Sequence, residues 1–496
     1  MSNTTEIVGN CPVMGEVDEG DTAWLVVSSA LVLIQTPGVA FFYGGMVRRK
    51  NMVNTIFLSF AAAGVVMIQW VLFGYSLAFG NGTKGLGNFN WGGLKGVSTA
   101  TPNADYAPTV PHLAFANFQM MFAVITPALI SGAVVERVSS LTWLVFVFLW
   151  TTLVYDPLAH WVWSAGSQYS SDGTECTYVT GWLRDMGAID FAGGTVIHIS
   201  SGMAGLVISL LIGKRHNVDR KKPHAPASVP FIILGCTLIW FGWLGFNGGS
   251  AAASGPLAVL AATNTSIAAA AGFLTWLLTD LAFNKGVKAS LVGASIGLVV
   301  SLVAITPASG YIYPGYSILF GVFPIWPSYF LMKYKHLLPF DDALDVFFCH
   351  GVGGMMGALM TGLFATTDVN PYGAEGAFYG NGRQLGIQIL AVVIAIAYSA
   401  VGTAVICIFL KYTIGLRASE EGQNDGMDRH YHDEEAFDEG EYMLERIANR
   451  VIQKMKAAET NSASSGETLE VALEMTEGKH QSNPELQQTN SGKSIS

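Results

Sequence analysis

The chain has 496 residues, of which 51% are hydrophobic and only 12% carry a charge, and its mean hydropathy is +0.41. This composition excludes an ordinary water-soluble globular protein and indicates many membrane-spanning segments. Most of the net charge of −10 lies in the tail, where 17 Asp and Glu stand against 8 Lys and Arg after residue 411. The rest of the chain is nearly neutral, which gives no indication of nucleic-acid binding.

Apolar stretches of about 20 residues, the length that spans ~30 Å of hydrocarbon, recur along the chain. The lipid core offers no water to the backbone, so each stretch must be helical. The sequence therefore predicts an all-α polytopic membrane protein, with eleven transmembrane helices between residues 23 and 411. These helices are centred near residues 33, 66, 123, 152, 202, 238, 272, 298, 325, 355 and 397.

Lys and Arg are distributed unevenly between the two sides of these predicted helices. An external N-terminus places 15 of the Lys and Arg residues up to Arg417 in the cytoplasm and leaves four outside. This agrees with the positive-inside rule, and an odd number of helices then puts the C-terminus in the cytoplasm. Residues 1–22 are acidic and polar, without the charge region of a signal peptide, and are predicted to be extracellular. We expect a multi-pass protein of the plasma membrane.

The fifth and tenth predicted helices share one spacing of polar and small residues. Asp190 stands eight residues before His198, Asp342 stands eight residues before His350, and glycines follow each histidine at plus four and plus seven. The first and sixth helices share the pattern Phe-x-Gly-Gly. Repeats of five helices, an odd number, must be inserted with opposite orientation. We therefore expect an inverted repeat of helices 1–5 and 6–10, braced by the eleventh helix.

The two histidines are the first candidates for function. An ionisable side chain inside a membrane helix is expensive and by default functional. One buried histidine alone is more often a packing residue that bonds to a neighbouring helix. Two histidines at matched positions favour function, because the site of a repeated transporter lies at the interface of its repeats. His198 and His350 are therefore predicted to line a pore.

The five cysteines fit no zinc or redox spacing, and we expect neither a metal site nor a cofactor. Cys236, Cys349 and Cys407 fall within predicted helices and are interpreted as packing residues. Cys11 and Cys176 both fall outside the cell, where an oxidising environment allows a disulfide between them.

The tail changes character in two steps. Residues 412–456 mix charged with apolar residues and are predicted to be a cytoplasmic regulatory segment. From residue 457 the chain is rich in Ser, Thr, Glu, Gln and Asn, a composition too polar to bury a core. Residues 457–496 are therefore predicted to be disordered.

Residues 190–202, Asp-Phe-Ala-Gly-Gly-Thr-Val-Ile-His-Ile-Ser-Ser-Gly, resemble the signature of the Amt/Mep/Rh ammonium transporters. Supporting motifs include Phe-Tyr-Gly-Gly at 42–45, Gly-Trp-Leu-Gly-Phe-Asn-Gly-Gly-Ser at 242–250 and Thr-Pro-Ala at 306–308. The resemblance covers about residues 23 to 436. It implies a transmembrane ammonium transporter of the Amt/Mep branch, and a homotrimer with one pore per subunit.

The resemblance also assigns an external recruitment site for the ammonium ion. Trp163 would offer its ring face to the ion, a contact worth roughly 0.5–2 kcal/mol, and Ser250 would accept a hydrogen bond from it. Phe118 and Phe122 match the family's Phe-Gln-x-x-Phe, in which the first ring flanks the ion. The second ring stacks on a partner, here Phe246, and closes the pore beneath. Without the resemblance, Trp163 is more simply a tryptophan of the membrane interface.

Below these rings a bare ammonium ion would face a Born cost of tens of kcal/mol, which it avoids by shedding its proton. A neutral imidazole has one donor and one acceptor nitrogen, so His198 and His350 suit neutral ammonia and a relay of the separated proton. Asp190 begins its helix two turns before His198 and cannot ligate that ring. We expect it to orient helix ends and carbonyl groups near the recruitment site, and the resemblance marks it as essential. Asp342 would be its cytoplasmic counterpart.

Two features depart from this pattern. Residues 426–432 resemble the family's Gly-Met-Asp regulatory segment, but the phosphorylated threonine of the plant type is absent and His430 stands near its place. The expected partner of the tail is a cytoplasmic regulator or a kinase acting elsewhere on it. Asp156, directly before Pro157 in the fourth helix, has no interpretation beyond a vestibule charge.

Three other classes of protein compete with the transporter interpretation. An ammonium sensor, whose tail signals and whose transport is secondary, fits the same residues. A membrane enzyme that uses the two histidines as acid and base lacks any nucleophile pairing, metal spacing or nucleotide loop. A gas pore of the Rh type is disfavoured, because Trp163 and Ser250 would form a cation site that Rh proteins lack.

Overall fold

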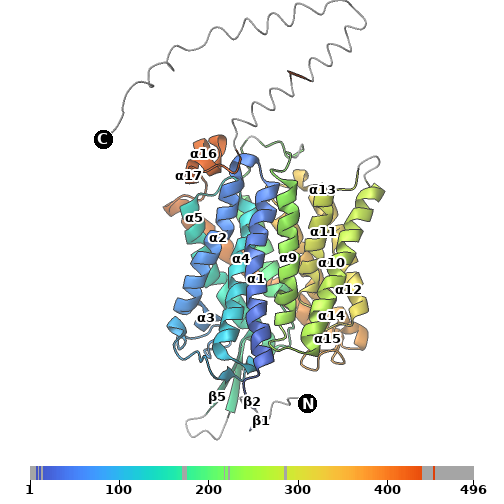
Figure 1. The fold of residues 1–496 in the computed structure, drawn as a ribbon. Helices are drawn as coiled ribbons and strands as arrows, with labels where there is room; N and C mark the ends of the chain where they lie inside the picture. The colour runs from blue at the N-terminus through green and yellow to red at the C-terminus, as the bar shows by residue number, and fades with distance from the viewer. Residues whose placement is uncertain are drawn as a thin grey trace, which may run out of the picture. The chain divides into compact units, whose positions relative to one another are not determined.

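The computed structural model describes residues 7–8, 11–12, 15–169, 176–216, 218–221, 224–283, 288–437 and 451–452. Residues 1–436 form one compact unit, and residues 437–496 form a second unit. In the first unit long helices run side by side, with short strands at one end and the helices of the regulatory segment at the other (Figure 1). The tail predicted to be disordered, 457–496, lies outside the described residues.

The first half of the bundle contains α1 (Glu19–Met46), α2 (Met52–Gln69), α3 (Tyr75–Phe79), α4 (His112–Val134), α5 (Ser140–Trp150), α6 (Asp156–Trp163), α7 (Trp182–Asp185) and α8 (Ser200–Ile212). The second half contains α9 (Val229–Gly249), α10 (Pro256–Phe283), α11 (Leu291–Ile305), α12 (Ser317–Val322), α13 (Ile325–Lys333) and α14 (Gly353–Phe364). It is followed by α15 (Gly382–Thr413), α16 (Glu420–Asp425) and α17 (Met427–His432). Four π-helical turns, Trp70–Gly74, Thr151–Tyr155, Gly194–Ile199 and Phe347–Val352, interrupt or begin these helices.

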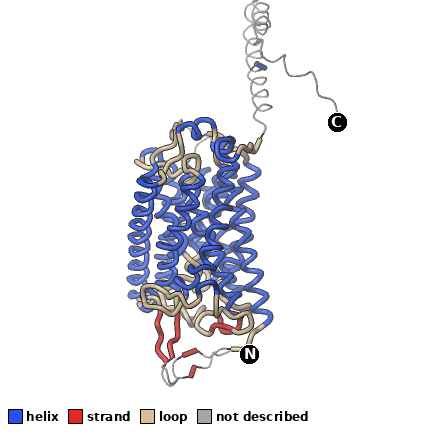
Figure 2. The backbone as a smooth tube through the Cα atoms, turned by 90° about the vertical axis from the view of Figure 1, so that its left-hand side faces the viewer, coloured by secondary structure: helices blue, strands red, loops and turns tan. Residues whose placement is uncertain are grey.

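Three two-stranded antiparallel hairpins lie at one end of the bundle (Figure 2). They are β1 (Ile7–Val8) with β2 (Cys11–Pro12), β3 (Pro102–Asn103) with β4 (Ala107–Pro111), and β5 (Ala165–Tyr169) with β6 (Cys176–Thr180). Strands β2 and β6 lie against each other. The side chains of Cys11 and Cys176 lie outside the described part of the structure, so their disulfide stays a prediction.

Among the described residues, ten helices are long and apolar enough to cross a membrane. The eighth predicted helix, α11, has 15 residues, which is about 22 Å at 1.5 Å per residue and less than the ~30 Å of hydrocarbon. The fold class is confirmed, but not the count of eleven full-length spans. The helix ends two residues before Pro307, which has no N–H and disfavours helix at the residue before it. The buried turns that follow are permitted because protein surrounds them.

Helices of the two halves meet as the expected repeat requires. The first and sixth spans, α1 and α9, pack along their lengths, and a Cβ on Gly235 of α9 would lie only 2.3 Å from the Phe42 nitrogen of α1. The fifth and tenth spans cross where a Cβ on Gly202 would lie 2.1 Å from the Gly351 nitrogen. Small residues thus let the backbones touch. Helix α15 packs on α5 and α8 of the first half and on α14 of the second, as a brace would.

A buried ionic cluster ties the loops at the α16–α17 end of the bundle. Glu136 pairs with Arg48 at 3.0 Å and with Arg215 at 3.5 Å, while Asp341 pairs with Arg215 at 2.9 Å and with Arg137 at 3.2 Å. Glu136 and Arg137 are wholly buried as side chains. Burial alone would raise the pKa of Glu136, but Arg215 and Arg48 lower it to about 2.

The predicted regulatory segment docks on the start of α2. The carboxylate of Asp428 accepts hydrogen bonds from the backbone nitrogens of Val53 and Asn54, at 2.9 and 2.8 Å. The nitrogen of Met427 donates to the side-chain oxygen of Asn51 at 2.9 Å. Free N–H groups and the helix dipole favour an anion at this helix end. Only residues 412–437 and 451–452 of this segment lie within the described part.

We expect Glu136→Gln to destabilise the protein at neutral pH and to lose most of its effect in acid. A carboxyl whose folded pKa lies below its unfolded pKa stabilises above the unfolded value, and this stabilisation disappears as pH falls from about 4.5 towards 2. The pKa difference corresponds to at most about 3 kcal/mol. The measurement is thermal unfolding of purified protein in detergent at pH 7 and pH 3. Asp185→Asn, which removes an exposed pair with Lys84, is the control and should change little at either pH.

Candidate functional site

Three phenylalanine rings from two helices close the candidate pathway on the side that the sequence predicts to be external. Phe118 and Phe122 lie on α4, one turn apart, with ring centroids 4.8 Å apart. Phe122 stacks on Phe246 of α9 at 4.2 Å and 19°. All three rings are buried. The stack that the sequence predicted is therefore present, and it leaves no open channel past these two rings.

Trp163 and Ser250 lie next to this stack and are partly exposed. The Trp163 ring meets Phe122 edge-on at 6.1 Å, and its Nε1 donates to the backbone oxygen of Asp190 at 2.9 Å. The Ser250 hydroxyl donates to the Phe246 carbonyl at 2.8 Å. Since that donor is already used, the Ser250 oxygen offers only acceptor lone pairs to any further group. The tryptophan is anchored through its N–H.

Asp190 fixes the start of the helix that carries His198. Its Oδ1 accepts from the nitrogens of Gly193 and Gly194 at 2.8 and 2.7 Å, and its Oδ2 accepts from Thr195 and Val196 at 2.8 and 3.2 Å. The free N–H groups at the helix start are thereby satisfied by one carboxylate. The geometry agrees with the expected orienting role, and Asp190 does not touch the imidazole of His198 in any described contact.

Asp342 repeats this arrangement in the second half. Its Oδ2 accepts from the nitrogen of Phe347 at 2.7 Å, at the start of the π-helical turn that carries His350. Its Oδ1 is buried and has no hydrogen-bond partner among the residues that the structure describes. Burial, together with the nearby charge of Asp345, raises the pKa of Asp342 to about 6. The two aspartates therefore share a position but not an environment.

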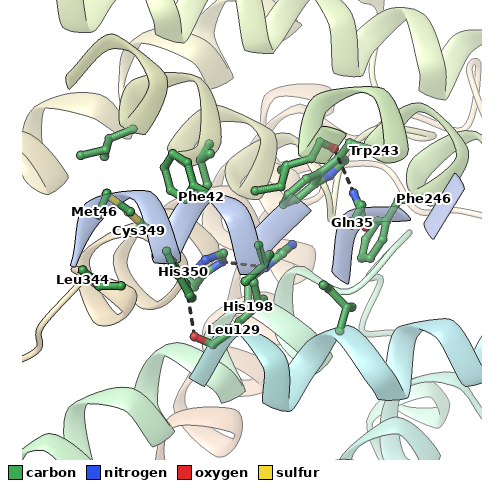
Figure 3. Close-up of a pocket in the computed structure, with 16 residues that line it drawn as sticks. Gln35, Phe42, Met46, Leu129, His198, Trp243, Phe246, Leu344, Cys349 and His350 are labelled. Atoms are coloured by element: carbon green, nitrogen blue, oxygen red, sulfur yellow. Dashed lines mark hydrogen bonds between the residues drawn. The ribbon is translucent and has the colours of Figure 1, made fainter. Parts of the chain in front are cut away.

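The two histidines face each other across the interface of the repeats (Figure 3). Their Nδ1 atoms are 3.2 Å apart, and their rings are almost parallel at 5.4 Å between centroids. A bond between two ring nitrogens requires one N–H and one lone pair, so the pair holds a single shared proton at this contact. The Nε2 atom of His198 is buried and has no partner in the described part of the protein.

Both histidines line a narrow apolar cavity beneath the phenylalanine stack. Its volume of about 20 Å³ is space for one water-sized molecule. Most of its lining is hydrophobic, and it includes Val39, Phe42, Tyr43, Ile125, Leu129, Ile239, Phe246, Val299, Leu344 and Cys349. Ammonia has about the size of water, whereas a cation in such a lining would lose its hydration without replacement.

Sequence reasoning missed the role of Trp243. Its ring stacks on His198 at 5.3 Å and 15°, and its Nε1 donates to the Thr306 hydroxyl at 2.9 Å. Trp243 also lines the cavity. Both Trp243 and Thr306 lie in motifs that carried the family resemblance, and that was the available signal. Among the described residues, no group of three His, Cys, Asp or Glu side chains could hold a metal ion.

The chain is similar in sequence and in fold to known ammonium transporters. The profile of the Ammonium Transporter Family matches residues 23–437. The chain is 44% identical to an ammonium transporter of Bacillus subtilis over 422 residues, covering 84% of this chain and 98% of the relative. The crystal structure of Candida albicans Mep2 superposes with a TM-score of 0.73 at 39% identity, covering 82% of this chain and 87% of that one. A structure described as a sensor Amt protein superposes at 0.72 with 25% identity, covering 83% and 98%.

We expect Asp190→Asn to lower the stability of the folded protein by about 1–3 kcal/mol, because an amide group replaces an oxygen that accepts two backbone N–H groups. Asp342→Asn is the matched variant, and it should cost less because that carboxylate has an unpaired oxygen. Thermal unfolding of both variants in detergent gives the comparison. Equal losses in the two variants would show that the four backbone bonds of Asp190 do not stabilise the helix start.

Proposed function

This chain belongs to the ammonium transporter family, and from that premise we propose how it moves its substrate. Ammonium is recruited from outside at Trp163 and Ser250, loses its proton beneath the phenylalanine stack, and passes as ammonia along the cavity lined by His198 and His350. The separated proton is relayed by the imidazole pair. Transport, rather than catalysis on a chemical substrate, is the function proposed for the site.

The observation that carries the proposal is the pair of imidazoles joined at 3.2 Å inside an apolar cavity. An ammonium ion stripped of water there would cost tens of kcal/mol, whereas neutral ammonia needs only a few hydrogen bonds. The partnerless Nε2 of His198 offers one such bond. A purely structural histidine pair would need neither the cavity nor this nitrogen.

The external recruitment site, formed by Trp163 and Ser250, supports selection of a cation before deprotonation. The Trp163 face supplies a cation–π contact, and the Ser250 oxygen supplies an acceptor. The stacked rings of Phe122 and Phe246 then separate the partly exposed site from the cavity. Passage requires these two rings to move, since their contact at 4.2 Å leaves no gap.

We propose further that the protein works as a homotrimer in the plasma membrane, with its N-terminus outside and its C-terminal segment in the cytoplasm. The docked Asp428 gives the regulatory segment a direct contact with α2. Burial raises the pKa of Asp428 to about 6. A cytoplasmic regulator or kinase that displaces this segment would therefore alter the start of a transmembrane helix.

An ammonium sensor is the second candidate. A structural relative at 25% identity is described as a sensor Amt protein, and the docked segment offers a route from the bundle to a signalling partner. A substitution that abolishes signalling but leaves uptake intact would favour the sensor. Ammonium-evoked current or uptake, in cells that lack their own ammonium transporters, tests the transporter directly.

We expect Trp163→Leu to weaken recruitment while the protein still folds, since leucine keeps apolar bulk but has no π face. The half-saturation concentration for ammonium uptake should rise by roughly 2–30-fold, equivalent to about 0.5–2 kcal/mol. Uptake is measured against concentration at fixed surface expression. Trp161→Leu is the control, because that ring packs on Trp182 and Tyr398 outside the proposed site. Unchanged kinetics in Trp163→Leu would remove the recruitment assignment.

The histidine variants test the relay. His350→Asp or His198→Asp places a carboxyl group in the cavity. A desolvated cation beside that group favours its ionised form, and the resulting anion compensates the charge of the intact cation. Ammonium should then pass as the ion, and potassium with it. His350→Ala should instead lower conduction or its preference for ammonium, because it leaves the Nδ1 of His198 without its partner.

Growth and current in ammonium and in potassium, normalised to folded protein, measure these outcomes. If both rings are only structural, each variant loses folded protein and the remainder keeps its selectivity. If every variant folds, carries ammonium at the parent rate and still excludes potassium, then the histidines only pack and the relay is wrong.

A further inference from the structure

The four π-helical turns found among the described residues occur in two pairs, and the proposed function uses only one pair. Gly194–Ile199 and Phe347–Val352 carry the histidines. Trp70–Gly74 and Thr151–Tyr155 lie in the second and fourth spans. Single π-turns inside helices frequently occur at functional sites, and no residue of the second pair lines the histidine cavity.

Two polar residues flank this second pair and bond to each other. Gln69 directly precedes one turn and Asp156 directly follows the other. The Gln69 Nε2 donates to the Asp156 Oδ2 at 2.7 Å and to the Thr152 hydroxyl at 3.2 Å. Asp156 is completely buried, although it lies within a membrane span. The amide of Gln69 thus uses both of its N–H groups here.

Asp156 lacks a cationic partner within the described part of the chain. Among the described residues, no Lys, Arg or His forms an ion pair with it. The titratable groups that face it are the phenols of Tyr155 and Tyr398, which are neutral at physiological pH. To stay protonated at pH 7, an aspartate must favour its neutral form by a factor of about a thousand more than it does in water. The free-energy cost of burying an isolated carboxylate in such surroundings is larger than this factor requires. The carboxyl is therefore held in its neutral form.

Four buried oxygen atoms on these two turns and the residues that flank them have no hydrogen-bond partner among the described residues: the Oδ1 of Asp156, the Oε1 of Gln69, the Oγ1 of Thr151 and the phenolic oxygen of Tyr155. Thr151 and Asp156 are stacked one π-turn apart, joined by the backbone bond from the Asp156 nitrogen to the Thr151 oxygen. The Tyr155 ring lies 6.4 Å from that of Trp70, the first residue of the other turn.

The hydrogen-bonding capacity of this set matches one water molecule. If Asp156 is protonated on Oδ1, its O–H and one of the two hydroxyls can donate to the water oxygen. The water can then donate to the Gln69 oxygen and to the other hydroxyl. A buried water of this kind typically makes two to four hydrogen bonds to otherwise unsatisfied groups.

We propose that Asp156 is a neutral carboxylic acid which, with Gln69, Thr151 and Tyr155, binds one buried water molecule at a site separate from the histidine cavity. None of the four lines that cavity. The site joins the second span to the fourth and fixes the π-turn from which α6 starts. Trp163 ends that helix seven residues later, about two turns on. Asp156 is thus a positioning residue for the Trp163 ring, and this last step alone rests on the proposed function.

Infrared spectroscopy of purified protein in lipid tests the site without any ammonium. At pH 8 the parent should show the C=O stretch of a protonated carboxyl, which shifts in D2O and is lost in Asp156→Asn. Asp342→Asn is the matched control: that second buried carboxyl has a pKa of about 6, so its removal should leave the band at pH 8 unchanged. Thr151→Val and Tyr155→Phe should each shift the band, because each removes one hydroxyl from the water.

Absence of the protonated band from the difference spectrum, or its replacement by a carboxylate band, would overturn the neutral acid and point to a bound cation instead. An unshifted band in both hydroxyl variants would overturn the water site. For the positioning role, Asp156→Asn should keep the half-saturation of uptake within about twofold of the parent, because its amide makes the same bonds. Asp156→Leu should raise it several-fold at an unchanged maximal rate. Equal kinetics in Leu and Asn variants would show that Asp156 does not position Trp163.

Discussion

The absence of water from the hydrocarbon core is the constraint on which this structure depends. A polar side chain that enters the core must find its partner inside the protein. His198 finds His350, and Asp156 finds Gln69. Asp190 instead remains at a helix start, where the backbone itself provides four donors. The histidine pair, the Gln69–Asp156 pair and Asp190 all lie in or directly beside the irregular turns of the spans.

Close approach of backbones makes the histidine contact possible. Gly202 and Gly351 touch so closely that any Cβ at 202 would collide with the neighbouring nitrogen. A larger residue there would push the two spans apart and stretch the 3.2 Å contact beyond hydrogen-bond length. The glycines at matched offsets are thus part of the site, although they supply no chemistry.

The sequence was sufficient for those features that repeat or that depend on composition alone. Apolar length located the spans, and the twin spacing indicated that His198 and His350 would meet. The stack of Phe122 on Phe246 followed from the family resemblance. The short α11 was not foreseen, because apolar residues continue past Pro307 into buried turns. An apolar stretch indicates that its residues are buried, but it does not show whether they form a helix or a turn inside the protein.

Contacts between distant residues that lie outside the repeated motifs could not be predicted from the sequence either. Gln69 and Asp156 are 87 positions apart, and neither belongs to a repeated motif. The π-turns cannot be recognised from the pattern of apolar residues. Each π-turn adds only one residue to a helix, and the helical pattern continues after it on a rotated face. Trp243 was likewise recognised as a motif residue but not as the ring that stacks on His198, because that contact joins residues far apart in the sequence.

The two halves show how far a repeat determines chemistry. Equal spacing gives Asp190 and Asp342 the same task, since each accepts backbone N–H groups before a histidine turn. Their surroundings then separate them. Both oxygens of Asp190 are filled, whereas Asp342 has one unpaired oxygen and a neighbouring acid that favours its protonation. If the spacing of residues alone determined the environment of each aspartate, two inverted copies would have equivalent ends. The differing neighbours make the two ends unequal.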